Sequence, residues 1–242
     1  MKILNTLLAA LVIATPVVTH AASVTVTIED AGVLNADLAG IGATGSAVET
    51  FDSVALGKLS GYTSVLGTYS AGQVNKANVY GGAEETPYFY VQNTPGSTLT
   101  LNTPATYLGF WWSAGSGGNQ VELLSGSSSI FSFNTNDVVS FIKTNADDPE
   151  SYYGNPNEGY LGKVSHEPFA FINIFSDMSF DSIVFSGGNF ESDNHTIAES
   201  YTGFKGTNIN PSPAPVPLPA PFALLAGGVA AIAFVKRRSR IK

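Results

Sequence analysis

The sequence contains no cysteine. Disulfide bridges, thiol catalysis and cysteine-ligated zinc are therefore excluded, although small exported proteins often depend on disulfides. The fold must be held by the burial of a hydrophobic core. The body of the chain, of about 190 residues, is long enough to form one domain with such a core.

Histidine is almost as scarce, with residues only at positions 20, 166 and 195. Neither the G-x-S-x-G nor the H-E-x-x-H motif occurs, and the contexts of His166 and His195 match no hydrolase motif. We expect both side chains to be polar residues of loops or strand edges. The sequence therefore predicts no catalytic residue and a protein that is not an enzyme.

Arginine is absent before Arg237, and basic residues are few throughout the body. Residues 23–206 contain nineteen Asp and Glu residues against five Lys residues, a net charge of −14. Nucleic-acid binding requires Lys and Arg clustered at the phosphates, so we expect no nucleic-acid partner.

The N-terminus carries the pattern of a secretory signal. Lys2 precedes an apolar run over residues 7–14, and the small residues Ala21 and Ala22 offer cleavage sites. We predict a signal peptide over residues 1–22, which makes the Sec translocon and signal peptidase partners of the precursor. An N-terminal membrane anchor is the alternative, but the apolar run is short for a span.

The C-terminus combines a proline-rich strip, an uncharged stretch and a basic end. Prolines at every second position from Pro211 to Pro221 exclude helix and favour an extended chain. The uncharged residues 218–235 are numerous enough for a transmembrane helix, and the positive charge that follows predicts a cytoplasmic tail. The basic residues of this tail are Lys236, Arg237, Arg238 and Arg240.

The pentapeptide Val216, Pro217, Leu218, Pro219, Ala220, with the apolar stretch and the basic end behind it, resembles the PEP-CTERM sorting signal in its VPLPA variant. The resemblance implies a protein that is exported, held briefly in the inner membrane and processed by an exosortase. It would then be released or attached at the cell envelope, often in bacteria that make exopolysaccharide.

This resemblance divides the chain into four parts. They are the signal peptide at 1–22, an ectodomain at 23–206, a proline-rich linker at 207–215 and the sorting signal at 216–242. The usual acidic residue between the prolines is missing, as in the VPLPA subgroup. A plain single-span membrane anchor is the alternative.

The body contains short segments rich in Val, Ile, Thr, Phe and Tyr, separated by Gly, Asn, Ser and Pro. Such spacing predicts an all-β domain, an antiparallel β-sandwich or barrel. We expect a strand at 137–142, a hairpin turning at Asp177 and Met178, and helix only near residues 30–40. The other expected strands are 23–29, 86–92, 97–102, 105–113, 120–126, 129–134, 168–176, 179–187 and 195–204.

The middle of the body carries a looser motif. Tyr107, Gly109 and Trp112, followed by a glycine-rich loop and by Val121 and Leu123, resemble the jelly-roll ectodomains that PEP-CTERM proteins often carry. The resemblance implies a jelly-roll-like β-sandwich, and some related sandwiches bind sugars.

Calcium is the ion that the acidic segments favour, because hard cations prefer several carboxylate, amide and carbonyl oxygens. The segments 49–52, 145–150 and 188–194 supply such oxygens without the spacing of an EF-hand. A solvated acidic loop is the alternative for each segment. The candidate ligands are Glu49, Asp52, Asp147, Asp148, Glu150, Glu191 and Asp193, and no other cofactor is expected.

Trp111 and Trp112 are candidates for contact with a sugar. Neighbouring residues of a strand point to opposite faces, so we expect one indole in the core and the other outside it. An exposed indole beside the loop 113–119 would stack on a sugar ring. The alternative is that the second indole covers a sheet face.

Two functions remain as hypotheses. The first is a non-enzymatic protein of the envelope or extracellular matrix that contacts exopolysaccharide. The second is a secreted hydrolase acting on polysaccharide, a chemistry for which two carboxylates suffice.

Overall fold

The computed structural model describes residues 22–92 and 96–209, which belong to one compact unit. Residues 1–21 of the predicted signal peptide, Ala21 included, lie outside these residues. The pentapeptide 216–220, the stretch 218–235 and the basic tail also lie outside them. These features stay predictions. Within the described residues, no helix combines the length and the apolar character that a bilayer crossing requires.

The described residues form one antiparallel sheet, which confirms the all-β prediction. Its main path runs β10-β9-β11-β8-β12-β7-β6-β3, and β1 is added beside β11. The strands are β1 (Val24–Ile28), β2 (Ala47–Glu49), β3 (Gly57–Leu59), β4 (Tyr62–Thr63), β5 (Gly67–Tyr69), β6 (Gly72–Asn75), β7 (Tyr88–Val91), β8 (Ser97–Ser113), β9 (Gln120–Ser125), β10 (Ser128–Asn134), β11 (Ala170–Ser186), β12 (Phe190–Ala198) and β13 (Thr207–Asn208).

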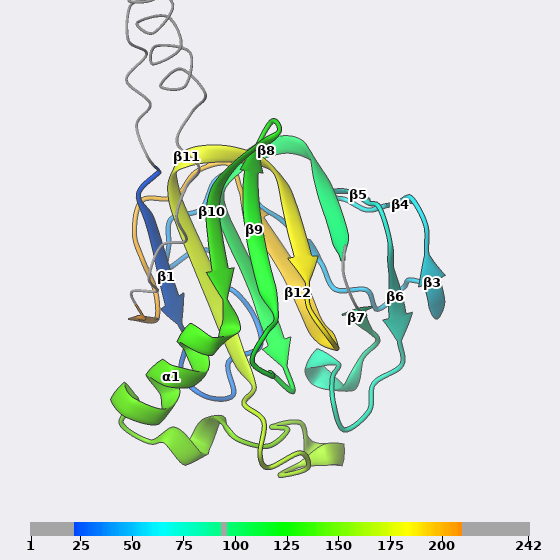
Figure 1. Cartoon of the computed structure of the whole chain (residues 1–242), viewed down its shortest axis with the longest axis vertical. Coiled ribbons are helices and arrows are strands. Elements are labelled where there is room, and N and C mark those ends of the chain that lie inside the picture. The colour runs from blue at the N-terminus through cyan, green and yellow to red at the C-terminus, as the bar shows by residue number, and fades with distance from the viewer. Residues whose placement is uncertain (1–21, 93–95, 210–242) are drawn as a thin grey trace, which may run out of the picture. The chain divides into compact units, whose positions relative to one another are not determined.

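The two longest strands, β8 and β11, bend and take part in two layers. Their pairing shifts register between Phe175 and Phe180 of β11, and Figure 1 shows both ribbons arching over at this level. Before the bend, β11 pairs with β1 and with the second half of β8. Beyond it, β11 pairs with β9 and with the first half of β8. The bend therefore turns a single sheet into two facing layers.

The side chains of the bent strands alternate between an inner side, which faces the main core, and an outer side. On β8 the inner residues are Leu108, Phe110 and Trp112, and all three are fully buried in the main core. Trp111 and Tyr107 point to the outer side and belong to two smaller clusters under surface segments. Both sides of this strand are thus covered, which explains its nearly continuous apolar sequence.

The helix α1 (Thr135–Asn145) corrects the predicted strand at 137–142. Asn134 caps the helix, because its side chain accepts a hydrogen bond from the backbone N–H of Asn136. The helix buries Thr135, Val138 and Ile142, which lie on one face at helical spacing. The helix expected near residues 30–40 is also wrong, because these residues form turns.

The predicted hairpin at Asp177 and Met178 is wrong as well. The chain passes through both residues as part of β11, with an irregularity at which the Ser176 hydroxyl bonds to the backbone of Met178. In the same way, the segments 97–102 and 105–113 join into one strand, β8. Polar residues inside these two strands mark the bend of the sheet and not a turn.

The last described strand, β13, pairs with β1 at Thr27 and Ile28. The backbone N–H of Ile209 then donates to the carbonyl of Val26. This strand lies at the start of the segment 207–215, which the sequence predicted as a linker. The rest of that segment lies beyond the described residues.

Candidate functional site

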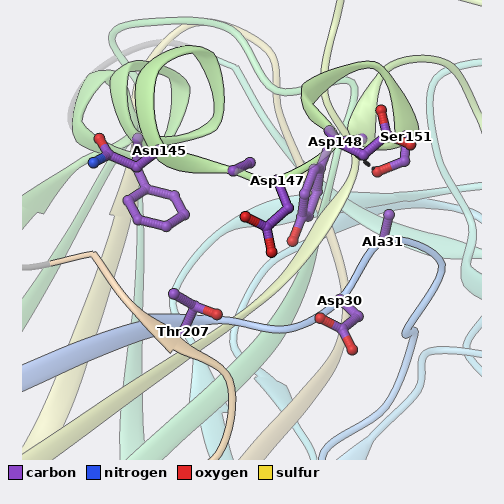
Figure 2. Close-up of a pocket in the computed structure, with 10 residues that line it drawn as sticks. Asp30, Ala31, Asn145, Asp147, Asp148, Ser151 and Thr207 are labelled. Carbon is purple, nitrogen blue, oxygen red and sulfur yellow. Dashed lines mark hydrogen bonds between the residues drawn. The ribbon is translucent and has the colours of Figure 1, made fainter.

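A pocket of about 440 Å³ lies where the end of β1 faces the C-terminal end of α1 and the turn η2 (Pro149–Tyr152) (Figure 2). Its lining combines the carboxylates of Asp30, Asp147 and Asp148 with the rings of Phe141 and Tyr152. The whole lining comes from three separate stretches of the chain, 30–31, 141–152 and 207. The topology thus joins an acidic segment after α1 to an acid that follows β1.

Tyr152 is the fixed part of this pocket. Its hydroxyl donates a 2.9 Å hydrogen bond to the backbone carbonyl of Glu29, and only 9% of the residue is exposed. Burial raises the pKa of Tyr152, so its hydroxyl stays a donor at neutral pH. The ring is therefore held in one orientation, as a binding surface requires.

The three carboxylates are the exposed part. Figure 2 shows the Asp147 side chain extending from the segment after α1 toward the side on which Asp30 and Thr207 lie. Ser151 holds the neighbouring backbone, because its hydroxyl donates to the carbonyl of Asp148 at 2.6 Å. Among the residues that the structure describes, no Lys or Arg lines the pocket. It therefore offers oxygen acceptors and apolar ring surface, and it disfavours anions.

The structure keeps Asp147 and Asp148 together but separates them from Glu150, the third acid of that segment. Glu150 lines another surface pocket, beside Lys143 and His166. Asp30 takes its place in the acidic group, and no sequence pattern pointed to it. Asp30 lies more than a hundred positions earlier in the chain, so only the fold brings it to the other acids.

The first acidic segment uses its oxygens locally. Glu49 accepts hydrogen bonds from the backbone N–H of Phe51, at 2.9 Å, and from the Tyr62 hydroxyl, at 3.0 Å. Asp52 accepts from the hydroxyl of Thr50 at 2.8 Å. Burial and the neighbouring Glu49 raise the pKa of Tyr62 to about 12, so this hydroxyl stays protonated. These contacts hold a turn that follows β2.

The third acidic segment is a strand rather than a loop. Glu191 and Asp193 belong to β12, and they are 7% and 0% exposed. Asp193 accepts hydrogen bonds of 2.8 Å from the backbone N–H groups of Ala83 and Asn194. Burial raises the pKa of each carboxyl to about 8, with Glu167 adding to the effect on Glu191. Desolvation thus outweighs the hydrogen bonds that favour ionised Asp193.

Both tryptophans are buried, which corrects the expectation of one exposed indole. Trp112 is 0% exposed and donates to the Asn119 side chain at 3.3 Å, and Trp111 is 1% exposed and packs against Phe169. The two indoles do point to opposite sides, as the alternation predicted. Segments outside the sheet cover the outer one, so neither indole presents a face to a sugar.

His195 is fully buried, which corrects its expected place at a loop or strand edge. Its Nδ1 is 3.0 Å from the Tyr69 hydroxyl, its Nε2 is 2.8 Å from the Ser192 hydroxyl, and aromatic rings surround it. Burial lowers the pKa of His195 to about 3, so the ring is neutral. Tyr69 stands where a catalytic triad has a carboxylate, and the chain Ser192–His195–Tyr69 holds the core together.

Comparisons with protein-family models, with curated protein sequences and with solved structures gave no match for this chain. Within residues 22–92 and 96–209, no three His, Asp or Glu side chains are grouped so that they could together hold a metal ion. The geometry of the pocket and of the buried groups is therefore the basis for the functional argument.

Proposed function

We propose that the chain is an exported, non-enzymatic protein of the cell envelope, and that its β domain contacts carbohydrate through the pocket between β1 and α1. The observation that carries the binding function is the combination of three carboxylates with a fixed tyrosine ring in one pocket. The two bent strands favour the finer description of the domain as a jelly-roll-like β-sandwich.

The lining of the pocket suits a sugar for two reasons. Carboxylate oxygens accept hydrogen bonds from hydroxyl groups, and such charge-assisted bonds are stronger than those between neutral groups. The half-buried ring of Phe141, beside the nearly buried Tyr152, provides apolar surface for the C–H face of a sugar ring. Neutral or cationic polysaccharide is favoured over anionic polysaccharide because the charged side chains among the described residues of the pocket are all acidic.

The terminal segments support the envelope location. A signal peptide would direct the precursor to the Sec translocon, and the pentapeptide 216–220 with its basic tail would direct it to an exosortase. In this proposal the membrane holds the precursor once, through residues 218–235, and exopolysaccharide is the partner of the mature protein.

Binding is tested with the full-length chain, purified in non-ionic detergent, on an array of neutral, cationic and anionic glycans. We expect retention of some neutral or cationic glycans and loss of retention in the double variant Asp147→Asn, Asp148→Asn. The control is Glu150→Gln, which removes a charge from the same segment outside the pocket. Unchanged retention by the double variant would refute the pocket as the binding site.

The same glycans distinguish binding from hydrolysis. Incubation should release no reducing ends, because the proposal includes no catalytic residue. If the chain hydrolyses a glycan and a single carboxylate substitution abolishes this turnover, the protein is a polysaccharide hydrolase and the non-enzymatic proposal is wrong.

Sorting is tested by mass spectrometry of the mature protein from its natural host. We expect an N-terminus near Ala22 and a C-terminus between Val216 and Pro221. A mature envelope pool that still ends at Lys242 would favour the plain membrane anchor.

A further inference from the structure

A second group of oxygen atoms lies on the outer side of the sheet, away from the pocket. Here β12 runs between β7 and β8, and Glu191 is paired with Ser113 of β8 on one side and with Tyr90 of β7 on the other. Directly opposite residues of antiparallel strands share a face, with Cβ atoms about 4.5–5.5 Å apart. The side chains of Glu191 and Ser113 therefore leave the sheet next to each other.

Both side chains are buried, and neither bonds to another residue among those that the structure describes. Ser113 is 0% exposed, and its Oγ makes no hydrogen bond with any described residue. Glu191 is 7% exposed, and no other described residue donates a hydrogen bond or forms an ion pair with its carboxylate. Buried polar groups are nearly always satisfied, so the unsatisfied Ser113 hydroxyl beside a buried carboxyl indicates a bonding partner outside the chain.

A second carboxylate acts on this position. Glu167 is partly buried, in the segment that leads to β11, and its charge acts on Glu191. Two hydrogen bonds hold the backbone of Glu167 in place. Its N–H donates to the carbonyl of Val164, and its carbonyl accepts from the N–H of Gly154. The N–H of Gly115 donates a 2.9 Å hydrogen bond to the carbonyl of Pro168, so the segment that carries Glu167 lies beside the end of β8. No described Lys, Arg or His forms an ion pair with Glu167 or Glu191.

We propose that Glu191, Glu167 and the Ser113 hydroxyl bind a divalent cation of the calcium type. All three donors are oxygen atoms, which hard cations prefer, and two carboxylates balance the charge of one such ion. Zinc is disfavoured because neither Cys nor His belongs to the group. Backbone carbonyls and water would complete the coordination, since these three side chains supply fewer oxygens than calcium requires.

The ion would connect parts of the fold that are distant in sequence. Glu191 lies on β12, Ser113 ends β8, and Glu167 belongs to the segment that leads from η3 (Glu158–Tyr160) to β11. Binding would therefore fix this segment on the outer side of the sheet and stabilise the folded chain. This inference does not depend on the carbohydrate proposal, because it uses none of the pocket residues.

Terbium, a luminescent substitute for calcium, gives a direct test. Trp111 is two residues before Ser113 and points to the same side of β8, so a bound terbium ion should emit when the indole is excited. The full-length chain is first treated with EDTA and kept in non-ionic detergent. We expect sensitised emission that calcium displaces, and a higher melting temperature in calcium than in sodium chloride. Absence of both signals would overturn the proposal.

The variant Glu191→Gln keeps the shape of the side chain and removes its charge. Its Kd for terbium should rise by at least about tenfold, because changes that only reorient a ligand already weaken metal binding by about 10–100-fold. Without metal, this variant should melt at or above the wild-type temperature, since a neutral amide replaces a buried carboxyl. Ser113→Ala should weaken terbium binding in the same direction.

Two further variants decide the location of the ion. The pocket variant Asp147→Asn, Asp148→Asn should bind terbium like wild type. Glu167→Gln removes the charge of the second proposed ligand, and it is used if Glu191→Gln fails to fold. If the pocket variant loses binding while the ligand variants retain it, the ion binds in the pocket and the proposal is wrong.

Discussion

Replacing His195 by glutamine should make the stability of the domain less sensitive to acid. The wild-type ring is buried among aromatic side chains, and burial lowers its pKa to about 3. In the unfolded chain the same ring takes a proton near pH 6.5. Below that pH the unfolded state binds more protons than the folded state, so wild-type stability falls as the pH falls through 6.5.

The size of the effect follows from the two pKa values. At pH 7.5 the His195 ring of the unfolded chain is almost entirely neutral, so its protonation lowers the free energy of unfolding hardly at all. At pH 5 the folded ring is still neutral, and protonation of the unfolded ring lowers the free energy of unfolding by about 2 kcal/mol. Glutamine does not titrate, so the variant lacks this loss.

Urea unfolding followed by tryptophan fluorescence, at pH 7.5 and pH 5 in the presence of EGTA, measures the difference. The variant starts lower at pH 7.5, because its amide replaces a ring that bonds to Tyr69 and Ser192. Its stability relative to wild type should then improve by about 2 kcal/mol at pH 5. Buried acids such as Asp193 titrate in both proteins, so their effect cancels in the difference between the two unfolding free energies. A difference that stays constant between the two pH values would refute the assignment of a buried neutral ring.

Two other substitutions test buried contacts by the same unfolding assay. Tyr107→Phe removes a hydroxyl that donates to the buried Asn173 side chain at 2.7 Å, and it should cost about 1–3 kcal/mol. Gly82→Ala should cost about 2 kcal/mol or more, because φ is +100° and the new Cβ would lie 2.2 Å from the Thr86 carbonyl oxygen. Gly32→Ala is its control, with φ of +84° but no atom within 4 Å, and should cost less. Equal losses of unfolding free energy in the two glycine variants would show that the contact with the Thr86 carbonyl oxygen does not cause the destabilisation.

Most of the longer strands were predictable from the sequence, but their continuity was not. The short strands β2 to β6 were not expected, and β12 begins and ends earlier than the expected strand at 195–204. Alternation and β-branched residues locate β1 and β9, and the same signals locate both halves of β11. The polar residues at Asp177 look like a turn because local sequence does not distinguish a bend shared by two layers from a hairpin. The helix α1 was predictable in principle, since Asn134 is a good N-cap and Val138 and Ile142 follow at helical spacing.

The candidate sites were predictable only in part. Asp147 and Asp148 were recognised as an acidic segment, but Asp30 joins them through the pairing of distant strands. Glu191 and His195 are polar residues, so their residue types predict exposed side chains, whereas the fold buries both. His195 lies inside because the fold surrounds it with bonding partners and aromatic rings, and a single sequence does not contain that information.

The position of β1 has a consequence for the order in which the domain folds. Its partners are β11 and β13, so Ile28 pairs with Ile172 and with Thr207, both far along the chain. Contacts this distant in sequence slow folding, because most of the chain must be ordered before they form. When the chain emerges from a ribosome or a translocation channel, its first strand has to wait for its last strands. We therefore expect one late, cooperative folding event after the whole domain has emerged.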